Sequence, residues 1–187
     1  MIRWLAIGAT ALLIGAPVQA WGTAKRLGPA CFDAAQQDRP SPRGIALCSR
    51  ALGSRKLLPH DRAATLVNRG ILFGRDRNFA AAIADYDAAL AVDPDLAEAH
   101  INKGIALNAL GGHAEAAIAE LTQGLALHPA NAAIAYYARG IADEMAGAVR
   151  DAYADYNQAA RLAPDWEAPA DELRRFAVVR AKKSMAA

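Results

Sequence analysis

Residues 63–94 read AATLVNRGILFGRDRNFAAAIADYDAALAVDP, and this stretch decides the fold because its pattern returns twice further along the chain. Residues 97–129 (AEAHINKGIALNALGGHAEAAIAELTQGLALHP) and 132–164 (AAIAYYARGIADEMAGAVRDAYADYNQAARLAP) carry the second and third copies. The closing prolines are spaced 35 residues apart, at Pro94, Pro129 and Pro164. A period of this length is typical of stacked two-helix repeats.

Each copy predicts two helices joined by a short turn. Apolar residues recur at helical spacing on both sides of a polar or glycine-containing segment, and proline ends the second helix. The expected turns are residues 75–78, 111–112 and 146–147. Alanine, the best helix former, accounts for 48 of the 187 residues, which favours an all-α fold and excludes a β-sandwich.

The repeat resembles the tetratricopeptide repeat (TPR), in which small residues and aromatic residues stand at fixed places. The first copy supplies these as Gly70, Phe73, Phe79, Ala82, Tyr86, Ala89 and Pro94. The resemblance implies a right-handed superhelical α-solenoid of antiparallel helix pairs, with repeats at about 63–96, 97–131 and 132–165. Small residues on the two helices of each repeat should face each other, and the expected pairs are Gly70 with Ala82, Gly104 with Ala117, and Gly140 with Ala152.

The segments on either side of the repeats predict caps. Residues 21–61 contain a helix predicted over Pro42–Leu58 and a short one over Cys31–Gln37. Residues 166–187 predict a C-terminal capping helix over Ala168–Lys183, with acids at its start and bases at its end, as the helix dipole favours. Terminal units with one polar face keep a solenoid soluble.

Residues 1–20 have the features of a cleaved signal peptide. Arg3 precedes an uncharged apolar run, and small residues stand at positions 18 and 20, where a signal peptidase cleaves. The alternative is a membrane anchor, although 17 uncharged residues are at the lower limit for a bilayer span. Cleavage predicts a periplasmic or secreted protein with no membrane span, and in such a compartment Cys31 and Cys48 should form a disulfide.

Charged residues recur at matched places in the three repeats. A base precedes the glycine of each first helix, and an acid follows 16 or 17 residues later on each second helix. The predicted pairs are Arg69 with Asp85, Lys103 with Glu120, and Arg139 with Asp155. A ladder of structural ion pairs is the preferred interpretation, because all three pairs join opposite charges, and a row that binds a charged ligand is the alternative.

One face of the first helices is the candidate binding site. The helical period places on or beside this face Val67, Asn68, Ile71, Glu98, Ile101, Ile105, Asn108, Tyr137 and Ile141. In the resembling family this face lines a concave groove, and an apolar groove suits an extended segment or an amphipathic helix of a partner. The alternative to an open groove is that neighbouring first helices or residues 21–29 cover the isoleucines. The sequence does not decide between an open and a covered face.

The sequence predicts a protein-interaction module of a bacterial cell envelope, with a protein or peptide partner. It offers no catalytic constellation, no metal-ligand spacing and no cofactor motif, so we expect a protein that is not an enzyme. A net charge of +2 argues against nucleic acid as a partner. The alternatives are a self-associating structural subunit that forms a homo-oligomer, and a cell-wall-acting enzyme that would use Glu98, Tyr137 or Glu144.

Overall fold

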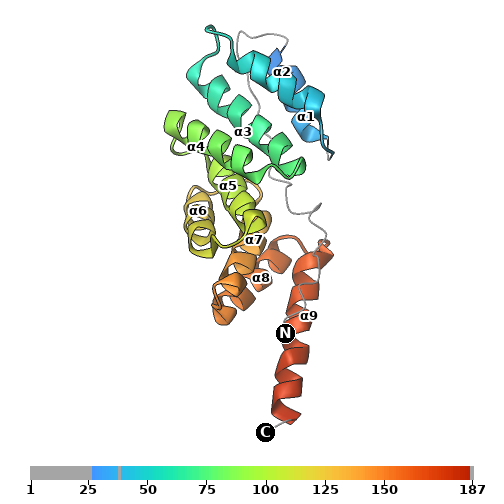
Figure 1. Ribbon diagram of the computed structural model, residues 1–187. Coiled ribbons are helices and arrows are strands. Elements are labelled where there is room, and N and C mark those ends of the chain that lie inside the picture. The colour runs from blue at the N-terminus through green and yellow to red at the C-terminus, as the bar shows by residue number, and fades with distance from the viewer. Residues whose placement is uncertain (1–26, 38, 186–187) are drawn as a thin grey trace.

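The computed structural model describes residues 27–37 and 39–185, and the predicted signal peptide lies outside them. Over these residues the chain is all-α, with nine helices that pack as sequential pairs (Figure 1). They are α1 (Leu27–Gln36), α2 (Pro42–Leu52), α3 (Pro59–Arg75), α4 (Phe79–Val92), α5 (Ala97–Leu110), α6 (Ala114–Ala126), α7 (Ala132–Met145), α8 (Val149–Leu162) and α9 (Glu167–Met185). The predicted all-α fold of paired helices is confirmed.

Local sequence explains where several helices begin. The Ser41 hydroxyl accepts a hydrogen bond from the amide of Gly44 at 3.0 Å, and Pro42 follows at a position where its missing N–H costs nothing. Asn78 caps α4 in the same way, through the amide of Ala81 at 3.2 Å. These caps satisfy amide groups that the helices themselves leave unpaired.

The N-terminal helices differ from the prediction at their ends. α2 ends at Leu52 rather than Leu58, and α3 begins at Pro59, ahead of the repeat pattern that starts at residue 63. Gly53 caps the end of α2, and the Arg62 side chain of α3 donates to the carbonyls of Leu52 and Ser54 at 3.0 and 3.2 Å. The Leu52 carbonyl at the end of α2 thus accepts a hydrogen bond from a side chain of α3.

Tight contacts hold each repeat together. The glycine of each first helix packs against a large side chain of the second helix, in the pairs Gly70 with Tyr86, Gly104 with Leu121, and Gly140 with Tyr156. At Gly140 an added Cβ would also lie 3.2 Å from the backbone carbonyl oxygen of Ala152, as the predicted glycine–alanine pair requires, but in every repeat the nearest atoms belong to the large side chain. The alanines are fully buried in the same clusters, but the large residue four positions later on the second helix presents its side chain to the glycine.

Aromatic residues join α9 to the last repeat. Tyr137 of α7 lies 5.5 Å from Tyr156 of α8 and 4.8 Å from Trp166, measured between ring centroids. Phe176 of α9 lies 6.0 Å from Tyr156. From this contact α9 continues away from the stack (Figure 1).

A disulfide between Cys31 and Cys48 joins α1 to α2. The two Cα atoms are 4.8 Å apart, both side chains are fully buried, and the Cys31 sulfur lies 4.0 Å from the Thr65 carbonyl oxygen of α3. The guanidinium of Arg75 donates to the carbonyl of Ala35 at 2.6 Å, so the cross-linked pair is also tied to the end of α3.

We expect the double variant Cys31→Ala/Cys48→Ala to lose about 3 kcal/mol of unfolding free energy, because the disulfide restricts the unfolded chain over 17 residues. Urea unfolding with and without reductant measures this loss. Reductant should lower the stability of the parent and leave the variant unchanged. Equal stability of the oxidised and reduced parent would contradict the prediction.

Candidate functional site

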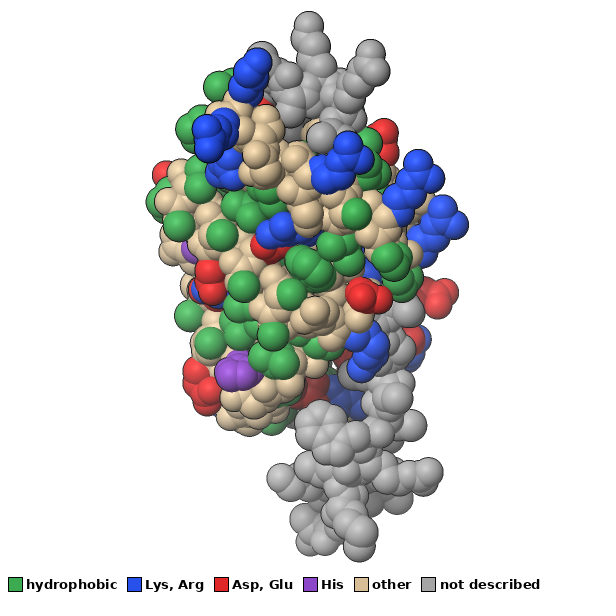
Figure 2. All heavy atoms as spheres, turned by 45° about the horizontal axis from the view of Figure 1, so that its top comes forward, with side chains coloured by type: hydrophobic (Ala, Val, Ile, Leu, Met, Phe, Trp, Pro, Cys, Tyr) green, Lys and Arg blue, Asp and Glu red, His purple; other side chains and the backbone are tan. Residues whose placement is uncertain are grey.

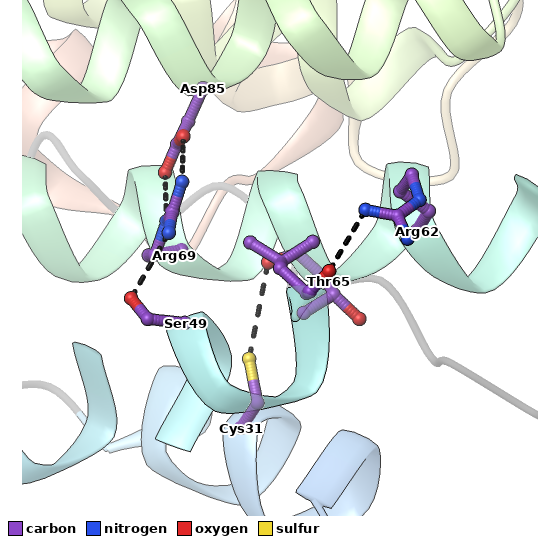
Figure 3. Close-up of polar contacts among 7 residues, drawn as sticks. Cys31, Ser49, Arg62, Thr65, Arg69 and Asp85 are labelled. Atoms are coloured by element: carbon purple, nitrogen blue, oxygen red, sulfur yellow. Dashed lines mark hydrogen bonds and ion pairs between the residues drawn. The ribbon is translucent and has the colours of Figure 1, made fainter. Parts of the chain in front are cut away.

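The three predicted ion pairs are brought together in the structure. Arg69 binds Asp85 with two hydrogen bonds of 2.7 Å (Figure 3). Arg139 binds Asp155 with two of 2.7 and 2.9 Å. Lys103 lies 2.7 Å from Glu120. Hydrogen bonding to the paired aspartate raises the pKa of both arginine side chains. One ion pair thus joins the two helices of each repeat.

Each base also contacts the second helix of the preceding unit, which the sequence analysis missed. Arg69 donates to the Ser49 hydroxyl at 3.0 Å, as Figure 3 shows, and Arg139 donates to the Thr122 hydroxyl at 3.1 Å. Lys103 reaches Asp87 at 2.6 Å. The row therefore joins neighbouring units as well as the helices within each one. The sequence does contain a signal for these contacts. When the repeats are aligned, Asp87 and Thr122 occupy the same position, directly after the large residue that packs on the glycine.

The second pair is part of a wider network. Burial alone would lower the pKa of Lys103 and raise that of Glu120, but their mutual hydrogen bond and those to Asp87 and His100 reverse both shifts. The Nδ1 atom of His100 lies 2.7 Å from Glu120. Because Lys103 is already paired with two carboxylates of the protein, it offers little to an anionic ligand.

A double-mutant cycle on Arg69→Ala and Asp85→Ala should give a coupling free energy of about 1–2 kcal/mol. That exceeds the value for an exposed pair because the hydrogen bonding is bidentate and the Asp85 side chain is only 8% exposed. Urea unfolding of the four proteins measures it. A coupling near zero would show that the pair does not stabilise the repeat.

Most of the predicted groove residues are buried. Val67, Ile71, Ile101, Ile105 and Tyr137 are at most 5% exposed, and Asn68 is fully buried. Ile71 packs in one core cluster with alanines of α4 and α5, and Ile105 packs in another with Ala135, Ala138 and Ala142 of α7. We name Val67, Ile71, Ile101, Ile105 and Ile141 the isoleucine face. Four of these five side chains belong to the core rather than to an open groove, which favours the alternative that neighbouring first helices cover them.

The polar residues predicted at the groove form hydrogen bonds within and between the stacked helices. Asn108 of α5 donates to the carbonyl of Ala138 on α7 at 2.7 Å, which joins two first helices. Asn102 donates to the carbonyl of Glu98 within α5 at 2.8 Å. Only Glu98, Asn108 and Ile141 among the nine predicted groove residues are more than marginally exposed.

The residues of the enzyme alternative do not form a site together. Glu144 accepts hydrogen bonds from the hydroxyl of Tyr156 and the guanidinium of Arg175. Tyr137 is buried, which raises its pKa to about 12. Glu98 lies on α5, whereas the other two lie on α7. Within the described ranges, no group of three or more His, Cys, Asp or Glu side chains is placed to hold a metal ion.

Charge is unevenly distributed along the stack. We define the acidic body as residues 76–172, which carry 16 acidic and 5 basic side chains, whereas residues 27–62 carry 6 basic and 3 acidic ones. In Figure 2 most Lys and Arg side chains lie in the upper half of the view, toward the N-terminal end of the stack. The net charge of +2 is small because it sums the acidic and the basic segments.

Two kinds of solved structure are similar to the chain. The first TPR domain of human RPAP3 aligns with a TM-score of 0.61 and 24% identity, over 70% of this chain and all of that one. MamA, residues 41 to the end, from Desulfovibrio magneticus RS-1 aligns with a TM-score of 0.68 and 21% identity, over 86% of this chain and 89% of that one. The chain has a TPR fold. TPR scaffolds are typically non-catalytic.

One similar TPR structure contains a ligand. The first TPR of Spaghetti (RPAP3), bound to the HSP90 peptide SRMEEVD, aligns at a TM-score of 0.61 and 23% identity, over 65% of this chain and 95% of that one. No protein-family model and no curated protein matches the sequence. None of the described helices combines the length and the apolar character needed to cross a membrane.

Proposed function

We propose that this TPR domain is a protein-interaction module or scaffold that binds a segment of a partner protein. The similar RPAP3 domain binds a peptide, and stacked helix pairs offer an extended surface for such binding. The observation that carries the proposal is the acidic body, which carries 16 acidic and 5 basic side chains. Electrostatic complementarity then selects a partner segment rich in Lys and Arg.

The bound segment should differ from the peptide of the similar domain. SRMEEVD has three acidic residues and one basic residue. The acidic body would repel such a peptide, because like charges brought together at an interface cost several kcal/mol. With most of the isoleucine face in the core, binding in this protein relies on charged surface beside that face, including Glu98 on α5.

We place the protein in a bacterial cell envelope, as a periplasmic or secreted component. The support is the signal-like pattern of residues 1–20 and the disulfide between Cys31 and Cys48, which persists in oxidising compartments. N-terminal sequencing of the protein from a periplasmic fraction should begin at Trp21. Intact Met1 in the membrane fraction would favour the anchor alternative.

Cross-linking with mass spectrometry in an envelope extract tests the function. A partner segment cross-linked to the acidic body should contain an excess of Lys and Arg, and added salt should weaken its capture. Partner segments with an excess of Asp and Glu, or capture that salt does not change, would contradict the proposal.

Self-association is a second candidate function, and the charge separation favours it. The basic segment 27–62 of one chain could face the acidic body of another, which is a head-to-tail contact. Light scattering at low and high salt distinguishes the two cases. The interaction module should have the mass of one chain under both conditions, whereas a structural subunit should lose mass as salt rises.

A further inference from the structure

A pocket of about 350 Å³ opens between α6, α7 and α8. Its polar lining consists of Thr122 from α6, Arg139 and Asp143 from α7, and Asp151 and Asp155 from α8. Ile118 and Ala154 form its apolar walls. We name it the third-repeat pocket.

The charges of this pocket are not balanced. Three of the five N–H groups of Arg139 donate to Asp155 and Thr122. Asp143 is only 6% exposed, and its carboxylate accepts no hydrogen bond from any described residue. Asp151 adds a further negative charge at the rim. One buried and one exposed carboxylate therefore share the pocket with a single base, Arg139, which is already hydrogen-bonded to a third carboxylate, Asp155.

The unpaired acids are specific to the third repeat. Counted from the glycine of each first helix, Asp143 corresponds to Phe73 and Leu107, which pack against the cores of the other repeats. Counted from the acid of each ion pair, Asp151 corresponds to Ala81 and Ala116. The first two repeats thus have apolar residues at the positions of Asp143 and Asp151. The fold of a repeat therefore does not require the two carboxylates.

Burial of Asp143 has an electrostatic cost. Desolvation and the nearby charges of Asp155 and Asp151 raise its pKa to about 6, against the opposing effect of Arg139. The carboxylate is therefore charged at pH 7.5 in a site that disfavours its charge, and a cation that enters the pocket removes this penalty.

We propose that the third-repeat pocket receives an arginine side chain of the partner protein, with Asp143 and Asp151 as the acceptors of its guanidinium. This assignment rests on the proposed interaction function and specifies its contact. A guanidinium offers five N–H donors in a planar fork and is less strongly hydrated than an ammonium group. Its aliphatic stem would lie against Ile118 and Ala154.

Titration of the ¹⁵N-labelled protein with Nα-acetyl-arginine amide at pH 7.5 tests the proposal without the partner. Saturable amide shifts should centre on Ile118, Thr122, Asp143 and Asp151. The uncharged citrulline analogue should leave these amides unchanged. Equal shifts with citrulline, or no saturable shift, would overturn the proposal, and an equal response to the lysine analogue would overturn the choice of arginine.

Variants locate the binding within the pocket. Asp143→Asn/Asp151→Asn should weaken arginine binding at least tenfold, whereas Glu115→Gln, which removes an exposed acid of α6 outside the pocket, should leave it unchanged. Binding to the parent should also weaken between pH 7.5 and pH 5, as Asp143 gains a proton. Unchanged affinity in the double variant would overturn the proposal. If a cross-linked partner still binds that variant, the interaction function stands and only the pocket assignment fails.

Discussion

Replacing Gly104 by valine is expected to lower the free energy of unfolding by about 3 kcal/mol or more, and the melting temperature with it. A Cβ atom at this position would lie 2.5 Å from Cγ of Leu121 and 3.1 Å from each of its methyl carbons. Leu121 is fully buried and is branched at the point of contact, so it cannot swing away. Overpacking of this kind costs about 1–3 kcal/mol, occasionally more, and loss of the helix–helix contact adds to it.

Gly53→Ala is the matched control for this change. Gly53 has helical backbone angles, and an added Cβ would meet only ordinary contacts, at 3.5 Å or more. The control should therefore be neutral or stabilising, by up to about 1 kcal/mol. Thermal melts followed by circular dichroism compare the two variants. A melting temperature of Gly104→Val within a few degrees of the parent would show that α5 and α6 can separate without loss of the fold.

The glycine contacts show how far the repeat pattern could predict the packing. The 35-residue period places a glycine on each first helix and a small residue on each second helix, and both are buried. Ala117 and Leu121 are four residues apart on one face of α6, so which of them meets the glycine depends on how far the second helix is shifted along its axis. A periodic sequence does not define that shift, and the structure brings the Leu121 side chain against Gly104.

The ion pairs follow from the same pattern because their partners lie within one repeat. A separation of 16 or 17 residues across a short turn brings the two side chains side by side, whatever the stacking of the units. The contacts to Ser49, Asp87 and Thr122 cross between units, so they depend on the stacking, which spacing within a repeat does not predict. The third-repeat pocket depends on it too, since its lining includes α6 of the preceding unit.

The sequence places the residues of the isoleucine face on one side of the first helices, but leaves open whether that side is covered. Helical period tells which side chains point the same way, and Ile105 and Ile101 do share a cluster. It does not tell what lies opposite them. Here the alanines of α7 are small enough for that helix to approach α5 closely, so the isoleucines are enclosed where larger residues would hold the helices apart.

Ile105→Asp is therefore expected to abolish folding rather than binding alone. The Ile105 side chain is 2% exposed, and truncation of such a residue to alanine costs about 2–5 kcal/mol. Aspartate adds a charge without a partner among Ile101, Ala135 and Ala138, and the total approaches the whole stability of a domain of this size. Circular dichroism should show loss of the helical signal at 25 °C.

Val149→Asp is the control, because it makes the same kind of change at an exposed site. Val149 is 54% exposed and stands at the first position of α8, where an acidic side chain suits the helix dipole. This variant should melt within a few degrees of the parent. An Ile105→Asp variant that keeps the parent's melting temperature while it loses its partner would instead mean that α7 leaves the face accessible in solution. In that case the isoleucine face, and not the acidic body alone, would be the surface on which the partner binds.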